Sequence, residues 1–505
     1  MLSRLNFLRG YQHLQNHDDE HSYPIPMSRL PSSTRPYHPP YSGRSSVLKM
    51  ALRHLSFRQI AILAAGVFLL ICGIILSSGI PPCYDDIWQY ERSLPQYNLT
   101  EALADVKSGK RKYLWFEKNV EGRGLNNVLQ EALIMNYVAY STNRAFVFED
   151  YVWSKNSPFS STVSEWSLTP SRTPLSAFIS GPTTGGPFGR DSSIATRSVH
   201  LDFFNSVCPP SARTVVSSAD SPTDSGGKEL VDWWVDKLSS VESDPCVVVD
   251  SSKEIFDFHF FGSSKHVVSV FELLRRSPIL TDFSWSPLVL SAILRNFAIF
   301  NPPNLKDLHG TSQHATMKGL VAVHLRRGDF QGHCKHLFKY RSLYMGLNTY
   351  PGILDSFDPE VHLREAMAAD KIEGHQRNED RENDILRPYY QKHCFPSIEQ
   401  IVQRLRVIRE ENPGSNLNRV YALSNGHASW LRELGRQLKA DGWGDVKSTI
   451  DLRLDGQQKY VSGAIDMAIA EKAEVFVGNG FSSLSSDVVM FRLTEGIPAS
   501  SNHFL

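Results

Sequence analysis

Residues 320–330 read L-V-A-V-H-L-R-R-G-D-F, an apolar run that ends abruptly in charged side chains. The short run Leu320–Val323, rich in β-branched residues, predicts a buried β-strand. Two arginines follow at the carboxyl end of this strand, which is where open α/β sheets bind their ligands. Because a guanidinium is a planar fork of donors that matches phosphate oxygens, the pattern predicts a phosphate or diphosphate ligand. The alternative is a structural ion pair between Arg326 and Asp329 at the end of a strand.

A second stretch with a similar design, at 119–127, reads N-V-E-G-R-G-L-N-N. It lies between a predicted strand at 112–115 and a predicted amphipathic helix at 125–142. Glycines let a ligand approach the backbone closely, and the first N–H groups of a helix bind anions. The loop therefore predicts a second ligand-binding segment, although a plain helix cap is the alternative for so short a pattern.

Four residues of this loop are candidates for a role in the site. Gly124 would allow the close backbone approach, while Arg123 and Asn126 would add hydrogen-bond donors. Glu121 supplies a carboxylate that can take a proton as a general base. Its alternative role is that of an exposed residue beside the helix cap.

Strand and helix patterns alternate around both motifs, which predicts an α/β fold with two Rossmann-like domains facing a cleft. The first domain is expected over 109–300, with a Ser/Thr/Pro/Gly-rich insertion at 154–228. The second domain is expected over 319–505, with a charge-rich insertion at 354–388. Residues 301–318 are expected to form the linker between them.

The segment Ile60–Ile80 contains no charged residue. Its length matches the ~20 residues that cross a bilayer as a helix. Basic residues precede it and acidic residues follow it, so the N-terminus is expected in the cytosol and the rest of the chain in the lumen. The sequence thus predicts a disordered cytosolic tail over 1–59, a transmembrane signal anchor and a stem over 81–108, as in a single-pass type II membrane protein. A buried helix of a soluble protein is the alternative.

Five of the cysteines would then lie in an oxidising lumen, where disulfides form. Cys208–Cys246 and Cys334–Cys394 are plausible pairs that leave Cys83 over, but sequence alone leaves other pairings open. The stretch Asn98-Leu99-Thr100 predicts an N-glycosylation acceptor on the same side of the anchor.

Composition and missing motifs exclude other classes of protein. Lysine plus arginine equals aspartate plus glutamate, at 53 each, so no nucleic-acid partner is expected. No G-x-G-x-x-G opens a helix after a strand, which excludes a dinucleotide-dependent dehydrogenase. Neither an Asp-x-Asp nor a His/Cys ligand spacing occurs, so we expect no metal cofactor.

Three motifs resemble those of a known family. The stretch His324–Phe330, H-L-R-R-G-D-F, resembles the first shared motif of GDP-fucose-dependent fucosyltransferases, both protein O-fucosyltransferases and α1,6-fucosyltransferases. Residues 465–483 are similar to their final motif, and Gly122–Asn127 to the loop that opens their amino-terminal domain. The resemblance spans 112–493 apart from the two insertions. It implies a GT-B glycosyltransferase whose second domain holds most of the donor.

Roles follow from the same resemblance, residue by residue. Arg326 would contact the β-phosphate of GDP-fucose and steady the leaving GDP, His324 would support the nucleotide, and Asp466 would read the guanine edge. Glu121 would stand where some protein O-fucosyltransferases place their catalytic base. The further residues implied at the substrate are Arg123, Gly124, Asn126, Asp329, Ser482 and Ser483.

The sequence therefore predicts an inverting, metal-independent transferase of the Golgi or endoplasmic reticulum, with its catalytic part lumenal. It would move fucose from GDP-fucose to a hydroxyl of a protein (Ser/Thr) or of a glycan. The alternatives are a related GT-B transferase with another nucleotide-deoxysugar or a polysaccharide acceptor, and a catalytically silent binding protein that kept the nucleotide fold.

Overall fold

The computed structural model divides the chain into two compact units, Met1–Ile80 and Pro81–Leu505, which are described separately. The residues that it describes are 56–78, 84–117, 124–152, 159–162, 167–170, 172–189, 193–223, 225–256, 262, 264–300, 316–328, 330–369 and 379–505.

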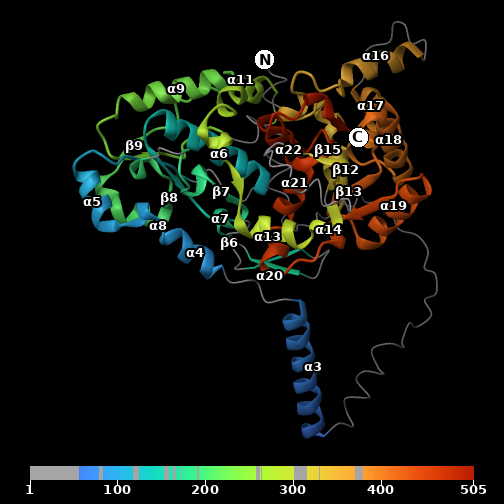
Figure 1. The fold of residues 1–505 in the computed structure, drawn as a ribbon, viewed down its shortest axis with the longest axis horizontal. Helices are drawn as coiled ribbons and strands as arrows, with labels where there is room; N and C mark the ends of the chain where they lie inside the picture. The colour runs from blue at the N-terminus through green and yellow to red at the C-terminus, as the bar shows by residue number, and fades with distance from the viewer. Residues whose placement is uncertain are drawn as a thin grey trace, which may run out of the picture. The chain divides into compact units, whose positions relative to one another are not determined.

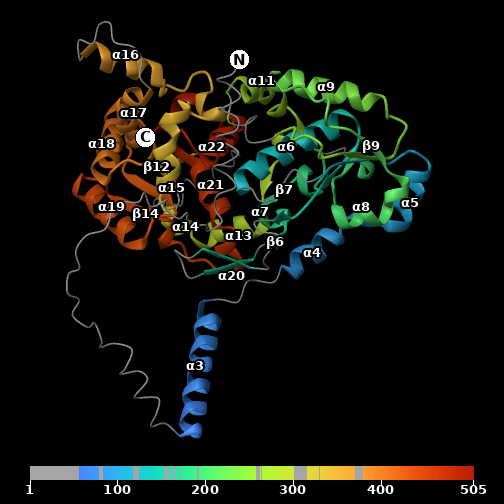
Figure 2. The same cartoon turned by 180° about the vertical axis from the view of Figure 1, so that it is seen from behind.

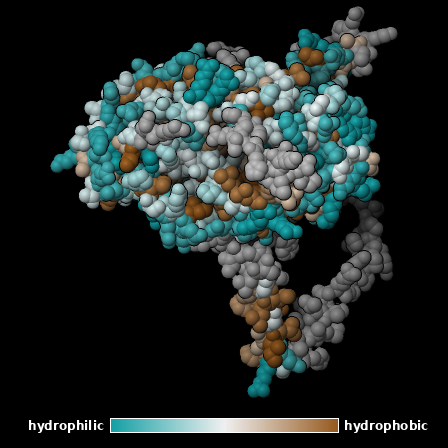
Figure 3. Space-filling view, in the orientation of Figure 1, coloured by the Kyte–Doolittle hydropathy of each residue, from teal (hydrophilic) through white to brown (hydrophobic). Residues whose placement is uncertain are grey.

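The first unit contains one helix, α3 (Phe57–Ser78), within its described residues. Alanine, leucine and isoleucine dominate this helix, and the side chains of residues 57–71 are exposed; its apolar residues are brown in Figure 3. Among the residues that the structure describes, no helix meets the length and apolarity required to cross a membrane. The anchor expected at Ile60–Ile80 is therefore not confirmed, and its last two residues lie outside the described part, as does 1–55 of the predicted tail.

The N-terminal half of the second unit is built on a parallel five-stranded sheet of order β8-β2-β1-β10-β9. Alternate strand residues face opposite layers of helices, so Leu114 packs with α6 and α9 while Tyr113 packs with α5 and α8. The elements are β1 (Tyr113–Phe116), β2 (Ala145–Phe148), β8 (Val199–His200), β9 (Thr214–Val216), β10 (Cys246–Val249), α5 (Leu99–Lys107), α6 (Leu125–Ser141), α8 (Leu201–Val207) and α9 (Gly227–Ser239).

The C-terminal half repeats this plan with a sheet of order β14-β13-β12-β15-β16, again fully parallel. Val321 and Val323 face α18 and α19, whereas Leu320 and Ala322 face α21 and α22 (Figure 1 and Figure 2). The elements are β12 (Met317–Leu325), β13 (Arg419–Ser424), β14 (Asp445–Ser448), β15 (Ala473–Gly478), β16 (Asn502–Phe504), α18 (Ile398–Glu411), α19 (Ala428–Ala440), α21 (Ser462–Lys472) and α22 (Ser483–Thr494). Two parallel five-stranded sheets confirm the predicted α/β class and are consistent with the GT-B architecture.

Shorter elements surround the two sheets. They are α4 (Asp85–Arg92), β3 (Tyr151–Val152), β4 (Phe159–Thr162), β5 (Ser167–Pro170), β6 (Arg172–Thr173), α7 (Leu175–Phe178), β7 (Ile179–Ser180), α11 (Ser264–Leu274), α12 (Pro278–Thr281), β11 (Ser284–Trp285), α13 (Pro287–Arg295), α14 (Phe297–Phe300), α15 (Phe330–Leu337), η7 (Gly346–Thr349), α16 (Pro359–Ala369), α17 (Glu379–Cys394) and α20 (Gly456–Tyr460).

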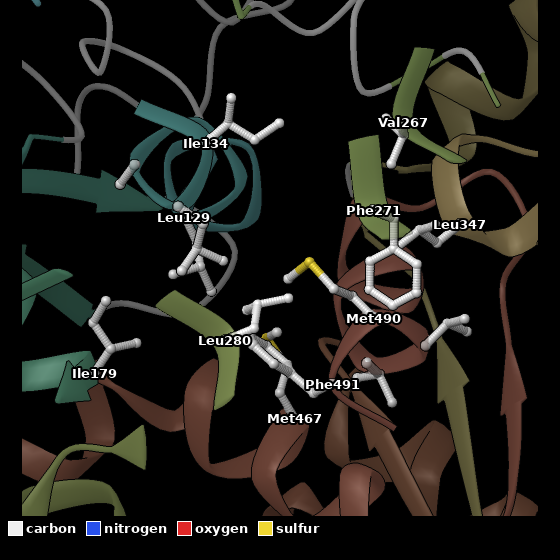
Figure 4. Packing of buried hydrophobic residues seen from close by; sticks show 14 of the residues in the cluster. Leu129, Ile134, Ile179, Val267, Phe271, Leu280, Leu347, Met467, Met490 and Phe491 are labelled. Atoms are coloured by element: carbon white, nitrogen blue, oxygen red, sulfur yellow. The ribbon is translucent and has the colours of Figure 1, made fainter. Parts of the chain in front are cut away.

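One apolar core joins the two halves. Figure 4 shows Leu129 of α6 and Leu280 of α12 on one side, with Met490 and Phe491 of α22 on the other. A hydrogen bond also joins the two halves, because Trp285 Nε1 donates to Glu471 Oε2 at 2.6 Å. Packing between the halves therefore includes α22, which begins at the last residue of the motif at 465–483.

Three segments differ from the sequence-based expectation. The stem expected at 81–108 is folded onto the N-terminal half, because Gln96 is buried and its amide donates to the Gly185 carbonyl at 2.8 Å. The insertion expected at 154–228 supplies β8 and β9 to the sheet, and strands of two or three residues are too short to show a period. The insertion expected at 354–388 holds α16 and most of α17, with buried Leu386.

Both plausible cystines are formed, Cys208–Cys246 and Cys334–Cys394. Cys83 lies outside the described residues, as does 301–315 of the expected linker. Disulfides of this kind are typical of proteins that fold in the secretory pathway.

Candidate functional site

The order of strands in the C-terminal sheet marks where a ligand would bind. From β12 the chain moves outward to β13 and β14, then returns to the other side of β12 for β15 and β16. Open α/β sheets bind ligands at the carboxyl ends of the two strands that flank such a switch point. Arg326 follows β12 and Asn479 follows β15, two strands that pair in parallel, so the first and last motifs of this half meet at the same edge of the sheet.

A buried hydrogen-bond network joins these two motifs. His324 Nδ1 lies 2.8 Å from Ser485 Oγ, and the same hydroxyl accepts the Asn479 N–H at 2.9 Å. Burial, together with the nearby Arg326 cation, lowers the pKa of His324 to about 3, so the imidazole is neutral at neutral pH. Ser485 can then donate its own proton to Nδ1, which leaves the imidazole proton on Nε2.

The turn between β15 and α22 is fixed from several sides. Asn479 donates through Nδ2 to the Cys394 carbonyl at 2.7 Å and accepts from the Phe481 N–H at 3.1 Å. A Cβ on Gly480 would lie 2.2 Å from the Tyr344 ring, so only glycine fits there. The turn ends at Ser482, whose side chain does not cap α22. The first N–H groups of that helix therefore remain suited to an anion.

The two neighbouring arginines have different surroundings. Arg327 is buried, with its guanidinium 4.3 Å from the Phe395 ring centroid and 4.1 Å from that of Trp430, and it donates to the Pro396 carbonyl at 2.5 Å. Burial lowers its pKa to about 10, which leaves it cationic at neutral pH. Arg326 is only half-buried and lies 4.9 Å from the Phe330 ring. Arg327 is thus a structural residue, and Arg326 is the candidate for a ligand.

Asp466 is buried beneath the end of β13. Tyr421 donates its hydroxyl to Oδ1 at 2.5 Å, and Thr449 donates to Oδ2 at 2.9 Å. Thr449 also accepts the Ser424 N–H at 3.2 Å, which ties the carboxyl group to the carboxyl edge of the sheet. Burial raises the pKa of Asp466 to about 7, although both hydrogen bonds lower it. The group therefore gains most from any further donor that favours its charged form.

The N-terminal half presents its own loop after its first strand. Gly124 is the N-cap of α6, and Asn126 in the first turn is half-buried with an Oδ1 that makes no hydrogen bond to the described residues. Glu121, Arg123 and Asp329 lie outside the described part of the chain, so their predicted roles stay predictions. The same holds for the predicted contacts of every other site residue with substrate.

Several residues of the network have no role in the sequence-based prediction. Asn479 lies inside the final motif and Ser485 two residues after it, so the motif itself indicated this part of the site. Tyr421 and Thr449 come from 45 and 17 positions before Asp466, and no local pattern connects them to it. Within the described residues, no cluster of three His, Cys, Asp or Glu side chains could hold a metal ion.

A parallel α/β domain with a cation and an open helix N-terminus at its switch point is that of a protein that binds a phosphorylated ligand. Residues 293–494 match the model of the family described as GDP-fucose protein O-fucosyltransferase. The matched region contains the motifs at 324–330 and 465–483, whose resemblance to GDP-fucose-dependent fucosyltransferases it supports.

Several solved structures resemble the chain at low identity. POFUT1 in complex with GDP-fucose shares 16% identity over 78% of this chain and 97% of its own, with a TM-score of 0.46. FUT1 of Arabidopsis thaliana in complex with GDP shares 9% identity over 82% and 78%, with a TM-score of 0.34. NodZ from Bradyrhizobium shares 12% over 75% and 93%, with a TM-score of 0.32. No curated protein matches the chain significantly.

Proposed function

We propose that this protein transfers fucose from GDP-fucose to a hydroxyl group of a protein (Ser/Thr) or of a glycan. The observation that carries the proposal is the bond between His324 and Ser485, 2.8 Å, with the Asn479 amide on the same hydroxyl. It holds the Arg326 end of β12 beside the N-terminus of α22. A cation and a set of free N–H groups then flank one crevice, which suits a diphosphate.

Recognition of the base is assigned to Asp466. Guanine carries a ring N–H and an exocyclic amino group side by side, and both can donate to one carboxylate. Uracil offers a single N–H on the equivalent edge, so a carboxylate discriminates between the two bases. The buried carboxyl of Asp466 would be drawn into its charged form by these donors, since hydrogen bonds to a carboxylate favour its ionised state.

The chemistry follows from where charge develops. The bond between fucose C1 and the β-phosphate oxygen breaks, and a bond from C1 to the acceptor oxygen forms on the opposite face of the sugar. Negative charge grows on the departing phosphate, where Arg326 and the N–H groups of Ser483 and its neighbours stabilise it. The acceptor hydroxyl gives its proton to a base, for which we propose Glu121. His324, being neutral, donates a hydrogen bond rather than a charge.

We further propose that the protein is held in the Golgi or endoplasmic reticulum membrane by the apolar segment Ile60–Ile80, with the Pro81–Leu505 unit in the lumen. Support comes from the uncharged sequence of this segment and from the two cystines, which require an oxidising compartment.

The first test is calorimetric titration of the protein with GDP in EDTA, with UDP as the comparison. Binding of GDP and not of UDP is expected, and Arg326→Ala should remove it. Arg436→Ala is the matched control, because Arg436 is exposed and paired with Glu433 outside the site. Failure of wild-type protein to bind either nucleotide would overturn the assignment.

A second assay separates the remaining alternatives. Fucose release from GDP-fucose should exceed sugar release from GDP-mannose or UDP-sugars when peptide and glycan acceptors are offered. Binding of GDP without transfer or hydrolysis of any donor would instead identify a silent binding protein.

A further inference from the structure

The helices α6 and α22, which both begin at the proposed site, contact each other in their second turns. The amide Nε2 of Gln130 on α6 donates to Oδ1 of Asp487 on α22, across 357 positions of sequence. Gln130 is 4% exposed and Asp487 is fully buried, so the contact lies in the core between the N-terminal and C-terminal halves.

The spacing on each helix connects this contact to the predicted site. Asn126 and Gln130 are four residues apart on α6, and Ser483 and Asp487 are four apart on α22, so each pair shares a helix face. Four residues span about 6 Å of helix axis. The first turn of α6 is therefore held near the first turn of α22, where the donor phosphates are proposed to bind.

The chemistry of the pair indicates its protonation state. Gln130 Oε1 and Asp487 Oδ2 are both buried and make no hydrogen bond to the described residues. A carboxylic acid offers one donor and one acceptor, as does the edge of an amide, so a neutral Asp487 can satisfy Gln130 with two hydrogen bonds. An ionised Asp487 would leave two oxygens facing each other and a buried charge without a partner cation, which is costly.

The surroundings agree with a neutral acid. Burial raises the pKa of Asp487 well above its usual range, and the Gln130 hydrogen bond lowers it less. Of the elements packed against α22, α12 and η7 carry no ionisable side chain. The ionisable residues of the other two are Glu131, Tyr137 and Tyr140 on α6 and Asp466, Glu471 and Lys472 on α21.

We propose that Asp487, as a neutral carboxylic acid paired with Gln130, is a positioning residue that fixes the start of α6 against the start of α22. It thereby sets where Asn126 and the preceding loop of the N-terminal half meet the donor bound by the C-terminal half. This inference rests on the proposed function, and it concerns the binding of GDP-fucose rather than that of the acceptor.

The test compares substitutions that keep or remove the paired hydrogen bonds. Asp487→Asn retains one donor and one acceptor, so its KM for GDP-fucose should stay within twofold of wild type. Asp487→Ala and Gln130→Ala should each raise that KM roughly tenfold, as expected for losing a buried hydrogen bond that orders a charged ligand's site. The KM for the acceptor should change less than twofold.

One double variant distinguishes loss of the polar contact from misfolding of the protein. The double variant Gln130→Leu with Asp487→Leu replaces the polar pair by apolar side chains of similar size, which often preserves stability. It should keep its melting temperature yet show the raised KM for GDP-fucose. An Asp487→Asn variant as impaired as Asp487→Ala, or an unchanged KM in the double variant, would overturn the inference while leaving GDP binding by wild type intact. Wild-type protein that fails to bind GDP would instead overturn the proposed function itself.

Discussion

Each half has a buried histidine at or near the carboxyl end of a strand, and the pKa values of the two imidazoles shift in opposite directions. His200 ends β8 in the N-terminal half, and Asp150 lies 3.4 Å from its Nε2. Burial lowers the pKa of His200, but the hydrogen bond and charge of Asp150 raise it more, so the net shift is upward. The pKa of His324, near the end of β12, is instead lowered by burial and by the Arg326 cation, so this imidazole is neutral.

The difference extends to the neighbouring arginines. In the N-terminal half, Arg172 forms an ion pair with Asp150 at 2.5 Å, so charge is balanced inside the protein. In the C-terminal half, burial keeps His324 neutral, the Arg327 cation packs against Phe395 and Trp430, and the half-buried Arg326 is the cation proposed to meet an anionic ligand. The two histidines thus differ in their charged neighbours, a carboxylate for His200 and an arginine for His324, and this difference yields the expectations below.

The largest difference in kcat is expected between alanine variants of Arg326 and Arg172. Arg326→Ala should lower kcat by about 10²–10³-fold, because one preorganised donor to the developing charge is lost. Arg172→Ala should leave kcat unchanged and cost at most about 1 kcal/mol of stability, because its side chain is 56% exposed. Steady-state kinetics and thermal unfolding on both variants provide the check. Equal kinetic effects would remove the distinction between the halves.

Asp466→Asn should weaken GDP binding roughly tenfold or more while stabilising the nucleotide-free protein. The pKa of Asp466 in the folded protein is about 7, above the usual 3.8. Between about pH 4 and pH 7 the folded protein therefore holds this proton more tightly than the unfolded chain does. Stability of the nucleotide-free wild type is thus expected to fall as pH rises from about 4 to about 7. The melting temperature of the variant relative to wild type should accordingly be higher at pH 8 than at pH 5. A pH-independent difference would show that Asp466 does not titrate in this window.

The two disulfides, one in each half, are expected to differ in their effect on KM for GDP-fucose. They close loops of 38 and 60 residues, so removing either should cost about 4 kcal/mol on chain-entropy grounds. Cys334–Cys394 borders the site, because the Cys394 carbonyl holds Asn479, whereas Cys208–Cys246 meets β10 at its amino end. Cys334→Ser should therefore raise KM for GDP-fucose several-fold as well, and Cys208→Ser should not. A raised KM in both variants would point to general destabilisation.

The smallest effects concern one glycine in each loop. Gly124→Ala should leave the melting temperature unchanged, since its φ of −61° is ordinary and an added Cβ would meet nothing within 4 Å. Gly480→Ala should lower it by a few degrees, because the Tyr344 ring would have to move. Thermal scans in the absence of nucleotide measure both, and equal melting temperatures would contradict the fit described for Gly480.

Much of this organisation could be predicted from the sequence where apolar runs are long or motifs are dense. Strand Ala145–Phe148 and helix Leu125–Ser141 follow directly from their patterns. Over 456–472 the sequence does not show that two helices occur, α20 and α21, which are separated at Val461 because Asp455 caps the short first one. The partners of Asp466 could not be foreseen, since strand pairing brings Tyr421 to it. Helix contacts such as Gln130 with Asp487 likewise depend on packing between distant segments.

The pairing of β12 also has a kinetic consequence. Val321 lies opposite Val420 on one side and Val475 on the other, about a hundred and a hundred and fifty positions later in the chain. Pairings this distant close large loops and form slowly. The proposed site at the carboxyl ends of β12 and β15 should hence be among the last parts to assemble during refolding. A nucleotide that binds only the finished crevice would draw the chain toward it, so the yield of refolded protein should rise with GDP concentration.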